Sequence, residues 1–298
     1  MSERSVILTA DDFGLSEAVN EGIERAHREG VLTHASLMVA GAAAQDAVRR
    51  AKRMRTLRVG LHVVAVEGPA VLPASDIPDL VDERGWFLSD QMKLALRYAF
   101  LPAARRQVAA EIRAQFAAFA ATGLPLDHAD AHKHMHLHPT VGRIMLAAGA
   151  DHGLRCVRVP NEPLEVMQRC GVRRSFAAWA LNAWTGGFRR RARAAGMQTT
   201  GAVFGLAWSG HMTEARVLRL LQHLPDGPSE LYFHPAARRD ELLNALMPDY
   251  EHIAELAALL SPRVRNALAA LAPATAAALA SAAAPEPTLG SPPAYSPG

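Results

Sequence analysis

Two adjacent carboxylates, Asp11 and Asp12, follow the first apolar stretch of the chain, which reads Ser-Val-Ile-Leu-Thr-Ala over residues 5–10. A short β-branched stretch of this kind predicts a strand, and α/β folds build their active sites at the carboxyl ends of strands. Two neighbouring acids at such an end can divide the chemistry: one binds a metal ion and the other handles a proton. The alternative is a capping turn with two solvated carboxylates, in which Ser16 caps the next helix.

Histidines are concentrated in one later segment, between Asp127 and Pro139, where five of eleven residues are histidine. We expect Asp127–Leu137 to be extended, and residues two apart in a strand face the same side. Four of the histidines would then form a row and not a tetrahedral cage, so the segment supplies one or two metal ligands only if other segments supply the rest. The alternative is a histidine-rich surface strand. The five histidines are His128, His132, His134, His136 and His138.

Two further histidines stand alone at predicted strands. His62 lies within the apolar segment Arg58–Val64, and His234 follows Glu230–Phe233 and precedes a proline. Because an open metal site takes about three protein ligands, Asp12 and His62 are candidates to complete a site with the clustered histidines. His234 can act as a general acid near neutral pH. The structural alternatives are a satisfied core histidine for His62 and a strand-end histidine held by backbone contacts for His234.

Together these residues predict amide hydrolysis without a covalent intermediate. A divalent metal ion held by Asp and two His lowers the pKa of its bound water, to about 7 for zinc. A neighbouring carboxylate then takes the proton of the water, and a histidine across the site protonates the leaving amine. This ligand set suits zinc and also accepts magnesium, manganese or cobalt. The sequence has neither a Gly-x-Ser-x-Gly elbow nor a phosphate-binding glycine loop.

Strand-like and helix-like segments alternate along the chain, which predicts parallel βαβ units. About seven such units within roughly 270 residues favour an α/β fold of the (β/α)-barrel type, a distorted TIM-type barrel, over an open sheet. We expect a single domain over residues 1–271 and a disordered Ala/Pro/Ser-rich tail over 272–298, which lacks the apolar content to pack. The predicted strands are Val6–Ala10, Ala35–Val39, Arg58–Val64, Cys156–Val159, Ala202–Ala207 and Glu230–Phe233. The predicted helices are Ser16–Glu29, Ala42–Met54, Gln107–Thr122, Thr140–His152, Phe176–Ala195 and Thr213–His223.

The composition is that of an ordinary globular protein, with 50% hydrophobic and 20% charged residues. Because the formal net charge is only +3, a nucleic-acid partner has no global electrostatic support. Two cysteines make no disulfide framework, and a reduced compartment fits them. The chain shows no basic-then-apolar signal sequence and no apolar run of the roughly 20 residues that a membrane span needs. We therefore expect a cytoplasmic protein.

Two segments combine large apolar residues with basic ones. Phe176–Arg193 contains four aromatic residues and four arginines, and Leu94–Arg106 mixes apolar residues with three arginines. This combination suits the surface of an anionic membrane and predicts peripheral contact at the inner membrane face. The alternative is a core-packing helix with a solvated basic end, and Gly186-Gly187 is expected to interrupt any single helix in the first segment. The sequence leaves homo-oligomerisation open.

Four short motifs resemble those of the YdjC-type carbohydrate deacetylases: Ala10-Asp-Asp-Phe-Gly14, Gly60-Leu-His62, Asp130-Ala-His-Lys-His-Met-His136 and Phe233-His-Pro235. Their order and spacing match the family over about residues 5 to 255. The resemblance implies a (β/α)-barrel-like fold that uses a divalent metal ion, Mg²⁺ or Zn²⁺, to remove acetyl groups from N-acetylated sugars. That family includes chitooligosaccharide deacetylases.

The same resemblance implies a role for each matching residue. Asp12, His62 and His132 would be the metal ligands. Asp11 would be the general base, and His234 the acid that protonates the leaving group. The two remaining histidines would contact the substrate or support the ligands; they are His134 and His136.

Longer motifs resemble one subgroup, the deacetylases associated with hopanoid biosynthesis. The subgroup implies removal of acetyl from an N-acetylglucosaminyl group on a hopanoid lipid. Most of these relatives carry an apolar residue where this chain has His138. The motifs are Thr9–Ser16, Ser36–Gly41, Leu72-Pro to Asp79–Asp82, and His132–Pro139.

Two other functions remain open at this stage. One is a metal hydrolase for a different amide or an ester, and the other is a non-catalytic protein that binds a metal ion or a sugar. Asp11 distinguishes catalysis from binding, because pure binding needs ligands but no second carboxylate. Within the pair we expect only Asp12 to contact a cation directly.

Overall fold

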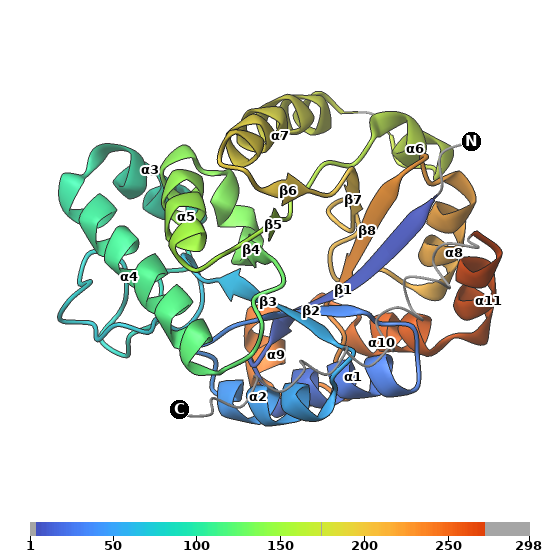
Figure 1. Cartoon of the computed structure of the whole chain (residues 1–298), viewed down its shortest axis with the longest axis horizontal. Coiled ribbons are helices and arrows are strands. Elements are labelled where there is room, and N and C mark those ends of the chain that lie inside the picture. The colour runs from blue at the N-terminus through green and yellow to red at the C-terminus, as the bar shows by residue number, and fades with distance from the viewer. Residues whose placement is uncertain (1–3, 174, 272–298) are drawn as a thin grey trace, which may run out of the picture.

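Eight parallel strands form one curled sheet in the computed structural model, which describes residues 4–173 and 175–271 (Figure 1). The strand order is β6-β5-β4-β3-β2-β1-β8-β7, so the consecutive strands β6 and β7 form its two edges and no pairing between them closes the described sheet. The predicted barrel-type α/β fold is confirmed, with eight strands instead of about seven. The strands are β1 (Ser5–Phe13), β2 (His34–Leu37), β3 (Arg58–Val63), β4 (Ala129–Ala131), β5 (Cys156–Val157), β6 (Gln198–Thr199), β7 (Ala202–Phe204) and β8 (Pro228–Phe233).

Helices surround the curled sheet on its outside (Figure 1). The first of them shows how local sequence sets a boundary: the hydroxyl oxygen of Ser16 accepts a hydrogen bond from the N–H of Val19, as the predicted N-cap requires. The α-helices are α1 (Glu17–Arg28), α2 (Ala44–Arg53), α3 (Gln91–Phe100), α4 (Pro102–Ala121), α5 (Pro139–Asp151), α6 (Leu164–Arg169), α7 (Phe176–Ala194), α8 (Glu214–His223), α9 (Glu241–Leu246), α10 (His252–Leu260) and α11 (Pro262–Leu271), and η1 (His132–Leu137) is a 3₁₀ helix.

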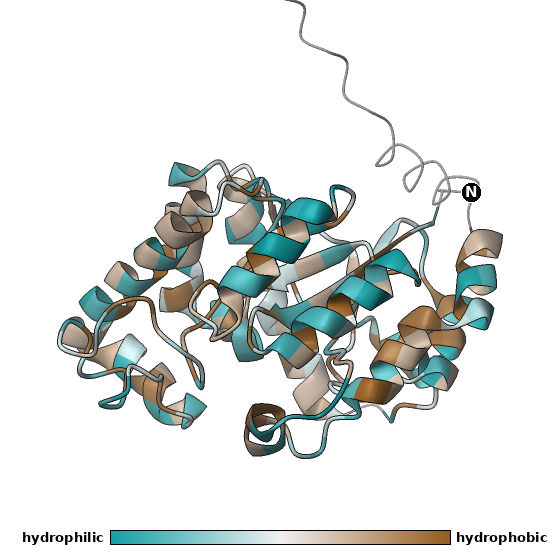
Figure 2. Cartoon of the chain, turned by 90° about the horizontal axis from the view of Figure 1, so that it is seen from below, coloured by the Kyte–Doolittle hydropathy of each residue, from teal (hydrophilic) through white to brown (hydrophobic). Residues whose placement is uncertain are grey.

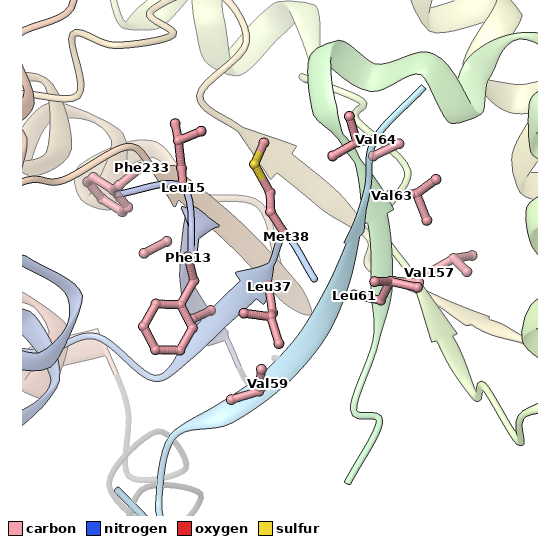
Figure 3. Close-up of a cluster of buried hydrophobic side chains, with 14 of the residues drawn as sticks. Phe13, Leu15, Leu37, Met38, Val59, Leu61, Val63, Val64, Val157 and Phe233 are labelled. Carbon is pink, nitrogen blue, oxygen red and sulfur yellow. The ribbon is translucent and has the colours of Figure 1, made fainter. Parts of the chain in front are cut away.

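The apolar core lies along the strands, where side chains such as Phe13, Leu37, Leu61 and Phe233 are fully buried (Figure 3). Seen from the side of α1 and α2, the central helices are largely hydrophilic, and several of the surrounding helices are more hydrophobic (Figure 2). Helices α1 and α2 bury one apolar side and leave their polar residues in water.

Polar residues occupy alternate positions on several strands and meet on the inner side of the curled sheet. In β1, Thr9 and Asp11 are separated from each other by the apolar Ala10. Thr9 contacts Glu230 of β8, and Asp11 contacts Arg158, which directly follows β5. The parallel register sets His62 of β3 beside Asp130 of β4. Because side chains alternate with period two, the same strands present apolar residues to the helices and polar ones to the interior.

The predicted extended segment Asp127–Leu137 is wrong beyond Ala131. Only β4 is a strand there, and the chain continues into η1, in which Lys133 and His134 have positive φ values of 48° and 55°. These two left-handed residues turn the chain, so the four histidines do not form a row along one strand face. Residue alternation carries no information on such a turn.

Helix α7 contradicts the expected break at Gly186-Gly187, because it runs without interruption from Phe176 to Ala194. A glycine inside a helix costs about 1 kcal/mol relative to alanine, which a helix of this length tolerates. The predicted tail at 272–298 lies outside the described residues. Within the described ranges, no helix is both long enough and apolar enough to cross a membrane.

Candidate active site

Three side chains from three strand ends meet at one carboxylate oxygen. Oδ1 of Asp12 lies 3.1 Å from Nδ1 of His132 and 3.4 Å from Nε2 of His62. Asp12 is in β1, His62 is in β3, and His132 follows β4. One ligand atom from each residue lies within 4.8 Å of the others, so the three could hold a metal ion. The structure thus brings together the three predicted metal ligands.

A cation fits this group because Oδ2 of Asp12 has no partner. The atom is buried and makes no hydrogen bond to any described residue. A buried carboxylate oxygen without a partner is costly, and a bound cation would supply one. The donor set, one carboxylate and two imidazoles, is typical of divalent metal sites with open positions.

The backbone at Asp12 explains how adjacent acids can both face the site. Asp12 has a φ of 62°, in the left-handed region, and the pairing of β1 with β2 shifts register between Ala10 and Phe13. In a regular strand, neighbouring side chains would point to opposite faces. The bulge lets Asp11 and Asp12 both reach the interior, at the cost of a strained backbone of the kind found at functional sites.

Asp130 orients the metal-facing imidazole of His62. Nδ1 of His62 lies 2.7 Å from Oδ1 of Asp130, which leaves Nε2 directed towards Asp12. The hydroxyl of Ser36 donates a hydrogen bond of 2.9 Å to the other oxygen of Asp130. A carboxylate behind a ligating histidine fixes the ring and its tautomer, as in many metal centres.

Arg158 holds the second carboxylate of the pair. Its guanidinium donates two hydrogen bonds to Asp11, of 2.6 Å and 2.8 Å, and one to Glu230 at 2.8 Å. It also forms an ion pair with Asp130 at 2.5 Å. The side chain of Arg158 is fully buried, and a buried charge is tolerated only when it is paired and hydrogen-bonded. We expected only Asp12 to contact a cation directly. This expectation is wrong, because the carboxylate of Asp11 contacts the guanidinium of Arg158.

Charges inside the site shift its pKa values. Burial acts to raise the pKa of Asp12, but His132 and His62 outweigh it and hold that pKa well below its ordinary value. Burial acts to lower the pKa of His62, but Asp130 and Asp12 raise it to about 10. The network of opposite charges therefore dominates over desolvation.

The two remaining histidines of η1 occupy different environments. His134 is partly exposed, and its Nε2 lies 3.0 Å from the hydroxyl of Tyr232. His136 is fully buried, and its Nε2–H donates to the carbonyl of Arg158 at 3.1 Å. Because His136 is fully buried, a supporting role fits it better than a substrate contact, and the roles of both histidines stay predictions.

His234 directly follows β8, and its main chain makes more hydrogen bonds than its imidazole ring does. Its N–H donates to Glu255, and its carbonyl accepts a 2.7 Å hydrogen bond from Nδ1 of His252. The buried Nδ1 of His234 has no partner among the described residues. Burial lowers the pKa of His234, and the carboxylates of Asp12 and Asp11 act against that shift. The structural alternative for His234 was a strand-end histidine held by backbone contacts. Such contacts explain how its main chain is held, but they give its imidazole no role.

The sequence reasoning missed three members of this network: Arg158, Glu230 and Tyr232. Arg158 is a single charged residue between two apolar ones, Val157 and Val159, whereas Glu230 lies between Ser229 and Leu231. This signal could have identified Arg158, because a charge in a buried strand needs a partner of opposite sign. Its partner could not have been named, since Asp11 lies 147 residues earlier in the chain.

Known proteins resemble this chain in sequence and in fold. The chain matches the family of YdjC-like proteins over residues 5–270. A carbohydrate deacetylase of Brevibacillus brevis is 42% identical over 147 residues, which cover 49% of this chain and 56% of that protein. A carbohydrate deacetylase of Mus musculus is 33% identical over 293 residues, which cover 89% of this chain and 90% of that protein.

One solved structure has the same fold over nearly the whole chain. It is a protein of Enterococcus faecalis V583 described as a cellobiose-phosphate cleavage protein, with a TM-score of 0.70 and 23% identity. The match covers 91% of this chain and 95% of that one. The likeness extends to the fold, and the match to the family spans almost all of the described residues. The chain therefore belongs to the family of YdjC-like proteins.

Proposed function

We propose that this protein is a metal-dependent hydrolase that removes the acetyl group from an N-acetylated sugar. The observation that carries the proposal is the trio of Asp12, His62 and His132, whose unpartnered carboxylate oxygen lies in a buried site next to Asp11. Relatives named carbohydrate deacetylase support this class of substrate. The bond that breaks is the amide C–N bond, and the products are acetate and the free amine of the sugar.

Asp12, His62 and His132 would hold a divalent metal ion, Mg²⁺ or Zn²⁺, which when bound polarises a carbonyl and lowers the pKa of water. Asp11 would take the proton of the attacking water as general base. Arg158 holds the Asp11 carboxylate in one orientation with one N–H on each oxygen. Each oxygen keeps a second lone pair, so the carboxylate can still accept a proton.

His234 would donate a proton to the leaving nitrogen as the C–N bond breaks. Its Nδ1 has no partner among the described residues, while Glu255 and His252 hold its main chain on both sides. His134, which is partly exposed beside Tyr232, would contact the sugar. These assignments give each of the predicted residues except His136 a direct part in the reaction.

For the natural substrate we propose an N-acetylglucosaminyl group on a hopanoid lipid, reached by peripheral contact with the cytoplasmic face of the membrane. The motifs that this chain shares with the hopanoid-associated subgroup support this choice, among them Ser36–Gly41 and His132–Pro139. A soluble chitooligosaccharide is the competing substrate of the same chemistry. A non-catalytic metal- or sugar-binding protein would need no counterpart of Asp11.

Mass spectrometry tests the proposal directly. Purified protein loaded with Mg²⁺ or Zn²⁺ is incubated with N-acetylglucosaminyl lipid and, separately, with chitooligosaccharides. We expect the lipid to lose the mass of one acetyl group, with Asp11→Asn protein as the inactive control that still contains metal. Loss from chitooligosaccharides alone would overturn the lipid assignment, and no loss from either substrate with either metal would overturn the deacetylase assignment.

A further inference from the structure

Large apolar side chains are exposed mainly on two helices, α3 and α7. Of the eight exposed large hydrophobic residues in the described ranges, seven lie on α3, at the residue that follows it, or on α7. Phe176 is 80% exposed, Phe100 71% and Met92 70%. Single exposed apolar residues scattered over a surface are ordinary, whereas several gathered on a few elements indicate an interaction site. The seven are Met92, Leu96, Phe100, Leu101, Phe176, Trp179 and Trp184.

Both helices pack with one side and expose apolar residues on another, where no described residue covers them. In α3, Leu94 and Tyr98 are buried, whereas Met92, Leu96 and Phe100 recur every four residues on an exposed stripe. In α7, the buried side chains belong to its second half, and the exposed aromatic residues begin at its first turn. Packing against the core, the alternative given by the sequence, thus explains the buried residues of each helix. It does not explain the exposed apolar stripes.

Apart from Asp90, the N-cap of α3, the charged residues of the two stretches that carry the stripes are basic. No Asp or Glu occurs over residues 91–110 or 166–213, which together contain eleven Lys and Arg residues. None of those that the structure describes forms an ion pair. On the opposite side of the molecule, by contrast, Arg50 of α2 pairs with Glu24 and Asp46. Unpaired cations beside exposed apolar residues fit an anionic surface and would repel a second copy of the same face.

This apolar and basic face adjoins the candidate active site through η1. The side-chain amide of Gln91, at the start of α3, donates to the carbonyl of Lys133 at 3.1 Å. The indole N–H of Trp184, in α7, donates to the carbonyl of Leu137 at 2.8 Å. Helix α5 lies between α3 and α7 (Figure 1). The two helices therefore hold both ends of the segment that begins with the metal-ligand candidate His132.

We propose that α3 and α7 form one docking face for an anionic phospholipid bilayer. The exposed aromatic and aliphatic side chains would enter the boundary between headgroups and acyl chains, and the arginines would contact lipid phosphates. Because η1 connects this face to the metal site, a sugar attached to a membrane lipid would meet the site while its lipid remains in the bilayer. This last step rests on the proposed function, whereas bilayer binding does not.

Co-sedimentation of the full chain with vesicles tests the face. We expect binding to phosphatidylcholine vesicles that contain phosphatidylglycerol, little binding to phosphatidylcholine alone, and loss of binding as salt rises. Phe176→Ser combined with Trp179→Ser should weaken the partition coefficient at least about tenfold, since it removes two aromatic side chains from the interface. Arg190→Glu should weaken it about tenfold, because one attraction becomes a repulsion.

Matched controls lie on other surfaces of the molecule. Ile253→Ser removes an exposed apolar residue of α10, and Arg53→Glu reverses an exposed charge of α2. Both should bind vesicles as the parent chain does, and circular dichroism should show all four variants folded. Equal loss in the controls, or no binding by the parent chain at low salt, would overturn the docking face.

Two further measurements separate this inference from the proposed function and from self-association. The Phe176→Ser, Trp179→Ser variant should deacetylate a soluble N-acetylated sugar at the parent rate while losing activity on the vesicle-bound substrate. A chain that binds vesicles but hydrolyses nothing would contradict the deacetylase assignment and leave the docking face intact. Sedimentation that shows a dimer dissociated by the same variant would instead assign the stripes to contact between two copies.

Discussion

The candidate site has two halves that differ in where their positive charge originates. In the first half, Asp12 contacts two imidazoles, and its other oxygen is buried without a hydrogen bond from residues 4–173 or 175–271. In the second half, both oxygens of Asp11 are engaged by the guanidinium of Arg158. The first half needs a bound metal ion to supply a cation, whereas in the second half the guanidinium of Arg158 is the cation. Two carboxylates adjacent in sequence thus acquire different chemistry from their tertiary partners alone.

The halves are coupled through Asp130. One of its oxygens contacts His62 in the metal half, and the other contacts Arg158 and the hydroxyl of Ser36. A change in either half is therefore transmitted to the other through one fully buried carboxylate. Substitutions can show how far the two halves act independently.

Asp12→Asn should have the largest effect. Asparagine tolerates the left-handed backbone at this position but lacks the charge that binds a cation. We expect loss of bound metal and a fall in turnover of at least about a thousandfold, since a catalytic metal contributes several kcal/mol. Elemental analysis and a deacetylation assay measure both. Unchanged metal content would show that the first half is not the metal site.

Asp11→Asn should lower turnover by about 10²–10⁴-fold, the usual contribution of a general base. Metal content should remain at the parent value, because Asp11 belongs to the second half. The same two measurements apply, together with thermal unfolding to confirm that Arg158 tolerates the neutral partner. Activity retained at the parent level would refute the role of Asp11 as base.

Arg158→Lys should lower turnover by about a hundredfold with metal content preserved. Lysine keeps the positive charge but cannot form the two-pronged contact, so Asp11 would lose its fixed orientation. The fall should appear in kcat more than in KM. A rise in KM with kcat unchanged would instead indicate that Arg158 contacts the substrate and does not position the base.

Ser36→Ala should have the smallest effect. It removes a buried hydrogen bond to Asp130 and another with His128, each of which contributes about 1 kcal/mol to the unfolding free energy. Loss of the bond to Asp130 should weaken metal binding about tenfold. Ser75→Ala is the matched control, because it removes a serine-to-aspartate hydrogen bond in an exposed position. Competition with a metal chelator compares the affinities. Equal values for the two variants would contradict coupling between the halves.

Much of the fold could be predicted from the sequence, because its signals are local. The Ser16 cap set the start of α1, and the apolar segment at Arg58–Val64 coincides with β3 to within one residue. The failures occurred where backbone geometry is not coded by alternation or composition. Examples are the left-handed pair Lys133 and His134, and the continuous helix through Gly186-Gly187.

The sequence by itself determined which residue types stand at the strand ends: the carboxylates of Asp11 and Asp12 and the imidazole of His62. Only the tertiary structure decided which of these side chains contact one another. A bulge in β1 turns both acids inward, and the parallel register brings Arg158 to Asp11 across 147 residues. A slip of one residue in that register would move each side chain of the strand to the other face of the sheet. No local sequence signal specifies the register. The division of labour between the two aspartates is therefore a property of the folded sheet.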